Sequence, residues 1–150
     1  MRQTSQKNRT RRTEAFTLIE LMLVVTLIAI ITAIALPNLT AARKAANEVS
    51  AISALRTLCT AQTHYRMRFG SYASLTDLTA TTTIDDSFND ALKSGYLFSA
   101  AVAPSASRWE LNADPQTPGI TGDRHFFIDH SGVIRYQEAG VATASDPAID

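Results

Sequence analysis

The 150-residue sequence predicts an α+β protein in which a long amino-terminal helix, transmembrane in its first half, packs against a small carboxy-terminal antiparallel sheet. An apolar run over residues 16–36 is followed by an amphipathic helical pattern that continues to about Phe69, where Gly70 ends it. Short strand-like runs separated by turn residues fill the rest of the chain. The length leaves room for about one small domain, so we expect the sheet and the second half of the helix to share one core.

Charge is distributed unevenly along the chain, although its formal net charge is zero. The first 15 residues carry five of the 14 Lys and Arg residues but one of the 14 Asp and Glu residues. The remaining residues therefore hold 9 basic and 13 acidic side chains, a net charge of −4. A net negative body has no general electrostatic attraction for nucleic acid, which argues against a nucleic-acid partner.

The apolar run at residues 16–36 is long enough to cross a membrane. Its 21 residues would extend about 32 Å as a helix. The basic residues before it should stay in the cytoplasm, which places everything after Pro37 outside. One interpretation is therefore a single-span anchor that carries a soluble domain.

A secretory signal is an alternative interpretation of the same segment. Residues 1–15 would supply the positive region, residues 21–34 the apolar core, and Ala33-Ile34-Ala35 the cleavage site. Glu20 counts against it, because a charge interrupts the start of the apolar core. A twin-arginine signal at Arg11-Arg12 has less support, since no apolar residues follow the arginines directly.

Glu20 is the only ionisable residue in the apolar run. A carboxylate inside a bilayer costs about 2.5–3.5 kcal/mol, so such an acid usually has a partner. No Lys, Arg or His occurs between Glu20 and Arg43. If the chain were cut before Phe16, a new α-amino group would lie four residues from Glu20. Copies staggered along a filament would then bring the amine of one chain to Glu20 of another, and a buried ion pair of this kind sets register.

The stretch AFTLIELMLVVTLIAIITAIALP, residues 15–37, resembles the amino terminus of type IV pilins and pseudopilins. The resemblance implies cleavage between Ala15 and Phe16 by prepilin peptidase, followed by N-methylation of Phe16 by the same enzyme. It also implies that Glu20 governs subunit assembly. Pro37 falls where the family's helix commonly kinks or melts in the assembled filament. Ala15 departs from the usual Gly, which leaves the efficiency of cleavage open.

This resemblance implies a structural subunit of a type IV pilus-type filament, not an enzyme. The implied partners are identical subunits, prepilin peptidase, membrane lipid before assembly, and an inner-membrane platform driven by a separate ATPase. The precursor would lie in the bacterial inner membrane with a cytoplasmic amino terminus, and the filament would be extracellular or periplasmic. Two alternatives remain open: a major pseudopilin of a type II secretion system, and a membrane-anchored or secreted envelope binding domain.

The chain thus divides into a basic leader (1–15), an assembly helix (16–37), an amphipathic extension (38–69) and a globular head (70–150). Residues at three- and four-residue steps predict the buried stripe of the extension, whereas charged residues such as Glu48 lie elsewhere. The members of this stripe are Ala42, Ala45, Val49, Ile52, Leu55, Cys59 and Gln62.

Three or four antiparallel strands are expected in the head. The strand-like runs cover residues 96–103, 107–113, 124–129 and 132–137, with a hairpin turn around His130-Ser131-Gly132. Residues 114–123 contain two Pro and two Gly and should form an exposed loop. The segment after Gly70 resembles the loop that opens onto the head in pilins. A short helix is expected near residues 87–94, and the tail should be mobile or lie over the sheet.

Catalytic chemistry is not predicted anywhere in the head. Cys59 is the single cysteine, which excludes an intrachain disulfide, and it lies about 140° around the helix from His64. Asp129, His130 and Ser131 are consecutive and cannot converge as a triad. His125 and His130 would face opposite sides of a strand, which argues against a zinc site.

Two further hypotheses concern ligands of the head, and a third prediction concerns its packing. Asp114, Asp123 and Asp129 are the candidate ligands for calcium, which some pseudopilins bind, but no dense acidic loop is present. Arg66 and Arg68 are candidates for DNA capture, although a solvated helix end is the simpler interpretation. Tyr65, Phe69 and Tyr72 predict an aromatic cluster under the loop.

Overall fold

The computed structural model describes residues 16–81, 84, 88 and 91–149. The predicted leader, including Ala15, lies outside these residues. The chain divides into two compact units, Met1–Pro37 and Asn38–Asp150.

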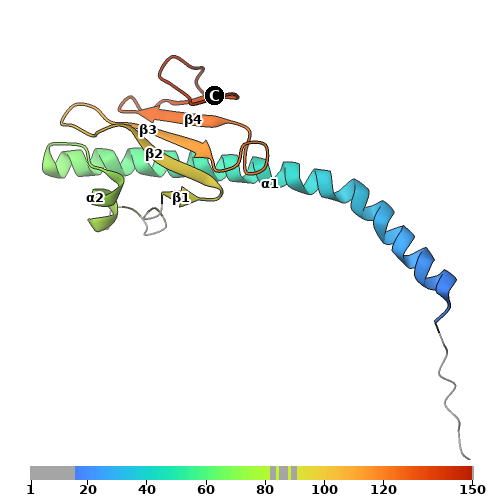
Figure 1. The fold of residues 1–150 in the computed structure, drawn as a ribbon. Helices are drawn as coiled ribbons and strands as arrows, with labels where there is room; N and C mark the ends of the chain where they lie inside the picture. Colours follow the sequence, from blue (N-terminus) through green and yellow to red (C-terminus); the bar gives the residue numbers. More distant parts are fainter. Residues whose placement is uncertain (1–15, 82–83, 85–87, 89–90, 150) are drawn as a thin grey trace, which may run out of the picture. The chain divides into compact units, whose positions relative to one another are not determined.

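The predicted α+β class is confirmed (Figure 1). Five strands form one antiparallel sheet in the order β1-β2-β3-β4-β5, so every strand pairs with its neighbour in sequence. The elements are α1 (Leu18–Phe69), α2 (Leu75–Ala80), β1 (Leu92–Lys93), β2 (Tyr96–Val102), β3 (Glu110–Pro115), β4 (His125–Asp129) and β5 (Ile134–Gln137).

The helix α1 ends where the sequence predicts. Gly70 follows Phe69 with φ of 78°, a left-handed conformation that glycine adopts without steric cost. The N–H of Gly70 donates to the carbonyl of Arg66 at 2.8 Å and closes the last turn. Three residues after Gly70 the chain is bonded back to α1, since the buried Gln62 side chain donates to the C=O of Ala73 and accepts from its N–H.

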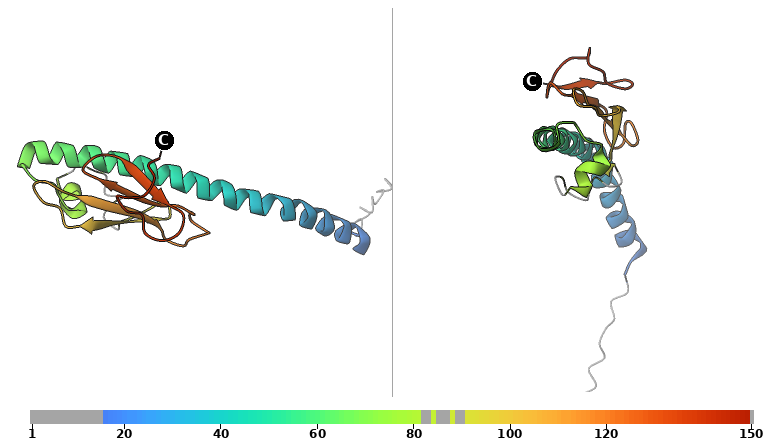
Figure 2. Two further views of the ribbon diagram at one scale, coloured as in Figure 1. Left: turned by 90° about the horizontal axis from the view of Figure 1, so that it is seen from above. Right: turned by 90° about the vertical axis from the view of Figure 1, so that its left-hand side faces the viewer.

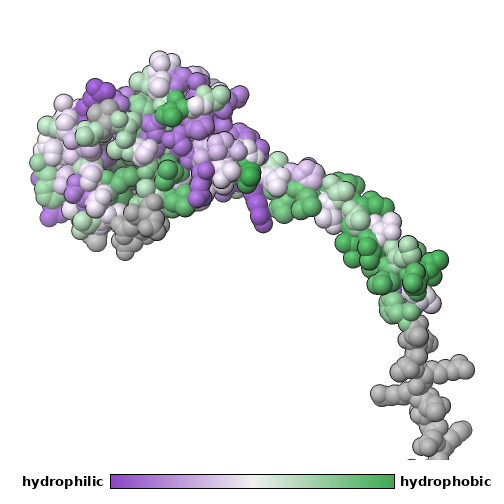
Figure 3. All heavy atoms as spheres, viewed as in Figure 1, coloured by the Kyte–Doolittle hydropathy of each residue, from purple (hydrophilic) through white to green (hydrophobic). Residues whose placement is uncertain are grey.

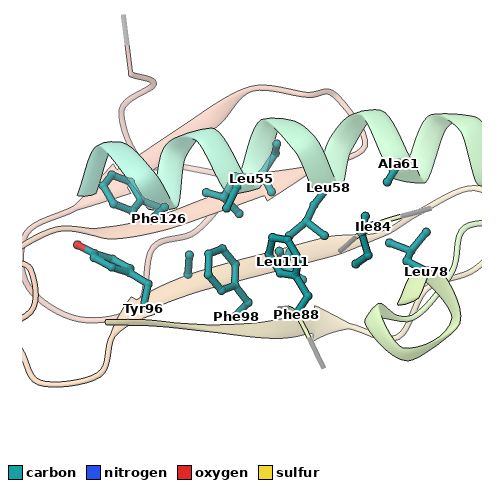
Figure 4. Close-up of a cluster of buried hydrophobic side chains, with 14 of the residues drawn as sticks. Leu55, Leu58, Ala61, Leu78, Ile84, Phe88, Tyr96, Phe98, Leu111 and Phe126 are labelled. Atoms are coloured by element: carbon teal, nitrogen blue, oxygen red, sulfur yellow. The ribbon is translucent and has the colours of Figure 1, made fainter. Parts of the chain in front are cut away.

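The core of the second unit lies between α1 and the sheet. Figure 2 shows the sheet along one side of the helix, and Figure 4 shows side chains from both elements pointing toward one another. Leu55 and Leu58 of α1 meet Phe98 of β2, Leu111 of β3 and Phe126 of β4 in one buried cluster. The predicted shared core is therefore present.

The predicted buried stripe of α1 is partly wrong. Leu55 and Gln62 are buried as expected, but Ala42, Ala45 and Val49 are exposed. The buried face instead consists of Glu48, Ala51, Ala54, Leu55, Leu58, Ala61 and Gln62. The predicted stripe was rotated around the helix because Glu48, as a charged residue, was placed on the solvent side. In the structure, Asp123 and Arg124 before β4 supply partners for that charge.

The short helix α2 was not predicted, although a local signal marks it. Ser74 caps the helix, because its hydroxyl accepts from the N–H of Asp77 at 3.1 Å. The Asp77 carboxylate in turn accepts from the N–H of Ser74 at 3.3 Å, which completes a capping box. Because the segment after Gly70 resembles a pilin loop, it was assigned to a loop, and the Ser74–Asp77 capping box was missed.

The strand boundaries differ from the prediction mainly at β3. This strand extends to Pro115, because Leu97 and Tyr96 of β2 pair with Asp114 and Pro115. The first two residues of the predicted loop 114–123 are therefore strand. A fifth strand, β1, occupies part of the region predicted as a short helix near residues 87–94, of which residues 87, 89 and 90 lie outside the described part of the chain.

The carboxy-terminal tail lies against β5 and over the sheet. The N–H of Ile149 donates to the carbonyl of Ile134, and the N–H of Tyr136 donates to the carbonyl of Pro147. Ala142 is buried and its carbonyl accepts from the Asn112 side chain on β3. The tail thus supplies main-chain partners to one edge of the sheet. Of the two predictions for the tail, mobile or lying over the sheet, the second is the one the structure shows.

Candidate functional site

The amino-terminal end of α1 is capped by Thr17, the residue directly before the helix. The N–H of Glu20 donates to Oγ1 of Thr17 at 3.3 Å, and this hydroxyl lies 3.5 Å from Oε2 of Glu20. Glu20 is in the first turn, where a carboxylate interacts favourably with the helix dipole. The T-x-x-E spacing is a capping signal that the sequence reasoning missed.

The rest of the first unit is an apolar helix with its polar groups satisfied internally. All its described residues are exposed, and the helix is long and apolar enough by length and composition to cross a membrane. The Thr26 and Thr32 hydroxyls each donate at 2.7 Å to a carbonyl one turn earlier, on Met22 and Ile28. Hydrophobic residues gather on this part of α1 in Figure 3. Glu20 is therefore the only charge of the described segment that a membrane or a helix bundle would have to accommodate.

A family model for the prokaryotic N-terminal methylation motif matches residues 10–36. This motif is the prepilin-type leader of type IV pilins and pseudopilins. The chain carries a prepilin-type amino terminus. No curated protein matches the chain.

Within this prepilin-type motif, the structure describes Phe16 and Glu20 but not Ala15. Phe16 is 74% exposed and precedes the helix, so its main chain lies outside the hydrogen-bonded turns. Among the described residues, the Glu20 side chain is hydrogen-bonded to Thr17 and takes part in no ion pair. The exposed carboxylate can thus accept a cationic partner from outside this subunit.

The motif ends one residue before Pro37, which lies inside α1. The helix continues through the proline in this isolated subunit. The expected kink or melting concerns the assembled filament and stays a prediction. A proline has no N–H donor, so the helix lacks one backbone hydrogen bond at this point.

A second polar cluster, which the sequence did not reveal, holds the head on α1. Glu48 is 8% exposed, and its carboxylate accepts from the N–H groups of Asp123 and Arg124 at 2.9 and 3.3 Å. Nε of Arg124 also donates to the Glu48 carboxylate, at 2.8 Å from Oε2. Lys44 pairs with Asp123 at 2.7 Å, and Asn47 donates to the carbonyl of Thr121 at 2.8 Å. This cluster has no local sequence signal, because each residue on α1 is more than 70 positions away from its partner in the turn before β4.

The three aspartates considered for calcium have separate partners. Asp114 lies 2.6 Å from Nδ1 of His125, Asp123 pairs with Lys44, and Asp129 accepts from the N–H of Ser131 in the β4–β5 turn. His130 is exposed in that turn. The described part of the chain contains no group of three or more His, Cys, Asp or Glu side chains that could hold a metal ion.

Cys59 packs against the β4–β5 turn. A Cβ on Gly132 would lie 3.5 Å from its Sγ, in ordinary contact. Burial raises the pKa of the Cys59 thiol, and the charge of Asp129 raises it further. The protonated thiol therefore serves as a small packing group, and His64 is exposed on another face of α1.

The aromatic cluster predicted at the end of α1 is only partly right, because its three residues form two separate ring contacts and Phe69 is 50% exposed. The Tyr65 and Phe69 rings lie 4.4 Å apart, and Tyr72 packs near the buried Trp109 at 6.2 Å. Arg66 donates to the Tyr72 hydroxyl at 2.9 Å and stacks on its ring, while Arg68 lies over Phe69. Both arginines are engaged with aromatic rings of their own subunit.

Proposed function

We propose that this chain is a structural subunit of a type IV pilus-type filament, with no catalytic activity of its own. One observation carries the proposal. Glu20 is the only ionisable side chain in an exposed apolar helix, inside a matched prepilin-type motif, four positions after the residue that cleavage would turn into an amino terminus.

Its mechanism begins in the bacterial inner membrane. The apolar half of α1 holds the precursor there with its basic leader in the cytoplasm. Prepilin peptidase removes residues 1–15 by cutting between Ala15 and Phe16, and the same enzyme methylates the new amine.

Assembly then uses the charge pair that cleavage creates. The amine of Phe16 in one subunit meets Glu20 of a neighbour, so that each acquires a partner in an apolar environment. A platform driven by a separate ATPase extracts the subunit into a helical polymer, and the backbone around Pro37 opens as the helices pack. The polymer lies outside the inner membrane.

A major pseudopilin of a type II secretion system is the second candidate. The small head without a disulfide fits both kinds of filament, since Cys59 is the single cysteine of the chain. The two candidates share the processing and assembly steps. They differ in the location of the polymer, which is the cell surface for a pilus and the periplasm for a pseudopilus.

Mass spectrometry of the amino terminus in membrane and filament fractions tests the proposal. We expect N-methyl-Phe16 in a polymer that contains this chain, and electron microscopy of labelled cells then locates the polymer. A mature chain that starts at Leu36 would establish the secretory alternative. A chain that keeps Met1 would leave a single-span anchor with an envelope binding domain.

A further inference from the structure

The sheet has a small second buried layer on the face that points away from α1. Phe126 and Ile128 of β4 belong to the core cluster, so Phe127 between them points to the opposite face. Phe127 is nevertheless only 3% exposed and lies outside that cluster. Asn112 of β3, which pairs with Phe127, donates to the carbonyl of the buried Ala142 in the tail. The tail therefore covers this face of the sheet.

The end of the tail closes the outer edge of β5, the last strand of the sheet. The N–H of Tyr136 donates to the carbonyl of Pro147 at 3.0 Å, and the N–H of Ile149 donates to the carbonyl of Ile134 at 2.9 Å. An uncovered edge strand presents unpaired N–H and C=O groups to any other strand. The tail thus occupies the position that a further strand would take.

Little apolar surface holds the tail in place. Residues 138–141 are exposed, and within the described part of the chain they make no hydrogen bond. After this hinge, Ala142 is buried and Ile149 is partly buried, whereas most of the residues between them are exposed. A segment with few buried apolar contacts can open locally while the rest of the domain stays folded. The tail has the properties of such a segment.

The closed tail also covers a polar atom that lacks a protein partner. Nδ2 of Asn112 donates to the carbonyl of Ala142 at 3.2 Å, but Oδ1 of the same side chain has no hydrogen-bond partner among the described residues. Asn112 is only 4% exposed, and a buried acceptor without a partner costs free energy. Release of the tail would expose this atom to water, so this cost favours opening.

We propose that residues 138–149 form a releasable strap that guards the edge of β5. The strap opens while the core between α1 and the sheet stays folded, and opening frees the N–H of Tyr136 and the carbonyl of Ile134. The strand that then competes for the edge is β5 of a second copy, because an antiparallel edge is self-complementary about a two-fold axis. The closed strap prevents two heads from pairing through their sheets. This role belongs to the head by itself and requires no polymer.

Hydrogen exchange in the full chain, held in detergent, tests the opening. In wild type the amides of Tyr136 and Ile149 should exchange about tenfold faster, or more, than the hydrogen-bonded amides between β3 and β4. Equal exchange rates for the two groups of amides would overturn the proposal.

A disulfide that locks the strap provides the comparison. Arg135 and Ala148 form an antiparallel bridge between the two main-chain bonds of the strap, a pair close enough for a disulfide. The variant carries Arg135→Cys and Ala148→Cys in a Cys59→Ser background. Oxidation should slow the exchange of the Ile149 amide about tenfold or more, and reduction should restore it. Unchanged exchange on oxidation would show that the strap does not open separately from the head.

Analytical ultracentrifugation of the full chain in the same detergent tests the guarding role. Ala142→Asp places a charge in the buried layer and should release the strap, whereas Ala139→Asp places it in the exposed hinge and is the matched control. We expect Ala142→Asp chains to pair at a concentration about tenfold lower, or less, than the control, with native Trp109 fluorescence in both. The oxidised lock should pair no better than the control. If Ala142→Asp loses the native fluorescence, Asn112→Ala replaces it, since it deletes only one bond to the strap. A released strap, shown by fast exchange, in a chain that pairs no better than the control would overturn the guarding role.

Discussion

Glu48 on α1 and Arg124 before β4 form an ion pair between residues 76 positions apart, with Nε 2.8 Å from Oε2. The second oxygen of the same carboxylate accepts from two main-chain N–H groups, of Asp123 and Arg124. One buried acid therefore joins the helix to the turn that starts β4. The buried carboxylate is tolerated because Asp123 and Arg124, in the turn before β4, supply three hydrogen-bond donors to it.

Replacing Glu48 should loosen this junction. Glu48→Gln keeps the shape but removes the charge that Arg124 and the two N–H groups face, so we expect the free energy of unfolding to fall by about 1–3 kcal/mol. The partial exposure of Arg124 limits the effect to this range. Urea unfolding in detergent, followed by the fluorescence of the single, buried Trp109, measures it. Glu138→Gln, at an exposed position, is the control and should change stability by less than about 0.5 kcal/mol. Equal stability of the two variants would show that the ion pair contributes nothing.

Gly122 is expected to be intolerant of any side chain. A Cβ there would collide with Oη of the buried Tyr96, whose hydroxyl donates to the carbonyl of Arg124. Gly122→Ala should therefore lower the free energy of unfolding by about 1–3 kcal/mol through overpacking. Gly119→Ala is the control: it has a positive φ but no atom within 4 Å of its Cβ, so strain alone should cost about 1 kcal/mol. A smaller loss for Gly122→Ala than for Gly119→Ala would contradict the packing of Tyr96.

The role proposed for Glu20 predicts a separation of processing from assembly. Glu20→Ala removes a charge from the apolar helix, so membrane insertion and cleavage should be retained. The filament would lose its ion pair, and we expect at least tenfold lower incorporation in competition with wild type. Quantitative mass spectrometry of purified polymer measures the ratio. Thr26→Ala, which removes a hydroxyl bonded only to its own helix, should incorporate normally. Equal incorporation of Glu20→Ala and wild type would disprove the register role.

Asp129 should make the stability of the head sensitive to acid. Burial raises the pKa of this carboxyl, but two hydrogen bonds from Ser131 and the charges of His130 and Arg135 outweigh it, so the pKa lies below its ordinary 3.8. A carboxyl with a depressed pKa in the folded state stabilises that state above its unfolded pKa, and the contribution is lost as the pH falls through the folded pKa. The loss should thus occur below about pH 4.

The variant Asp129→Asn tests this pH dependence. Unfolding free energies measured between pH 3 and 6 should fall less steeply with acid for the variant than for wild type. Parallel profiles for the two proteins would mean that Asp129 does not contribute to acid sensitivity.

Several features follow from the sequence because their signals are local. The apolar run, its length and its single acid depend on residues that are neighbours in the chain, and so do the end of α1 at Gly70 and the prepilin-type motif. The class of the fold follows as well, since a helix with one apolar side and several short strands can form a core only together. The assembly residues Phe16 and Glu20 were identified in this way, and their roles stay predictions.

Other features were decided only by tertiary structure. The sequence placed Glu48 on the solvent side of α1, because nothing near it in the chain offers a partner for its charge; the partners come from residues 123 and 124. The sequence predicted an exposed loop at residues 114–123, and only the structure shows that the side chains of Lys44, Asn47 and Glu48 bond the end of this loop to α1. Long-range hydrogen bonds and ion pairs between residues far apart in the chain determine which face of an amphipathic helix is buried, and hydrophobic spacing alone does not contain that information.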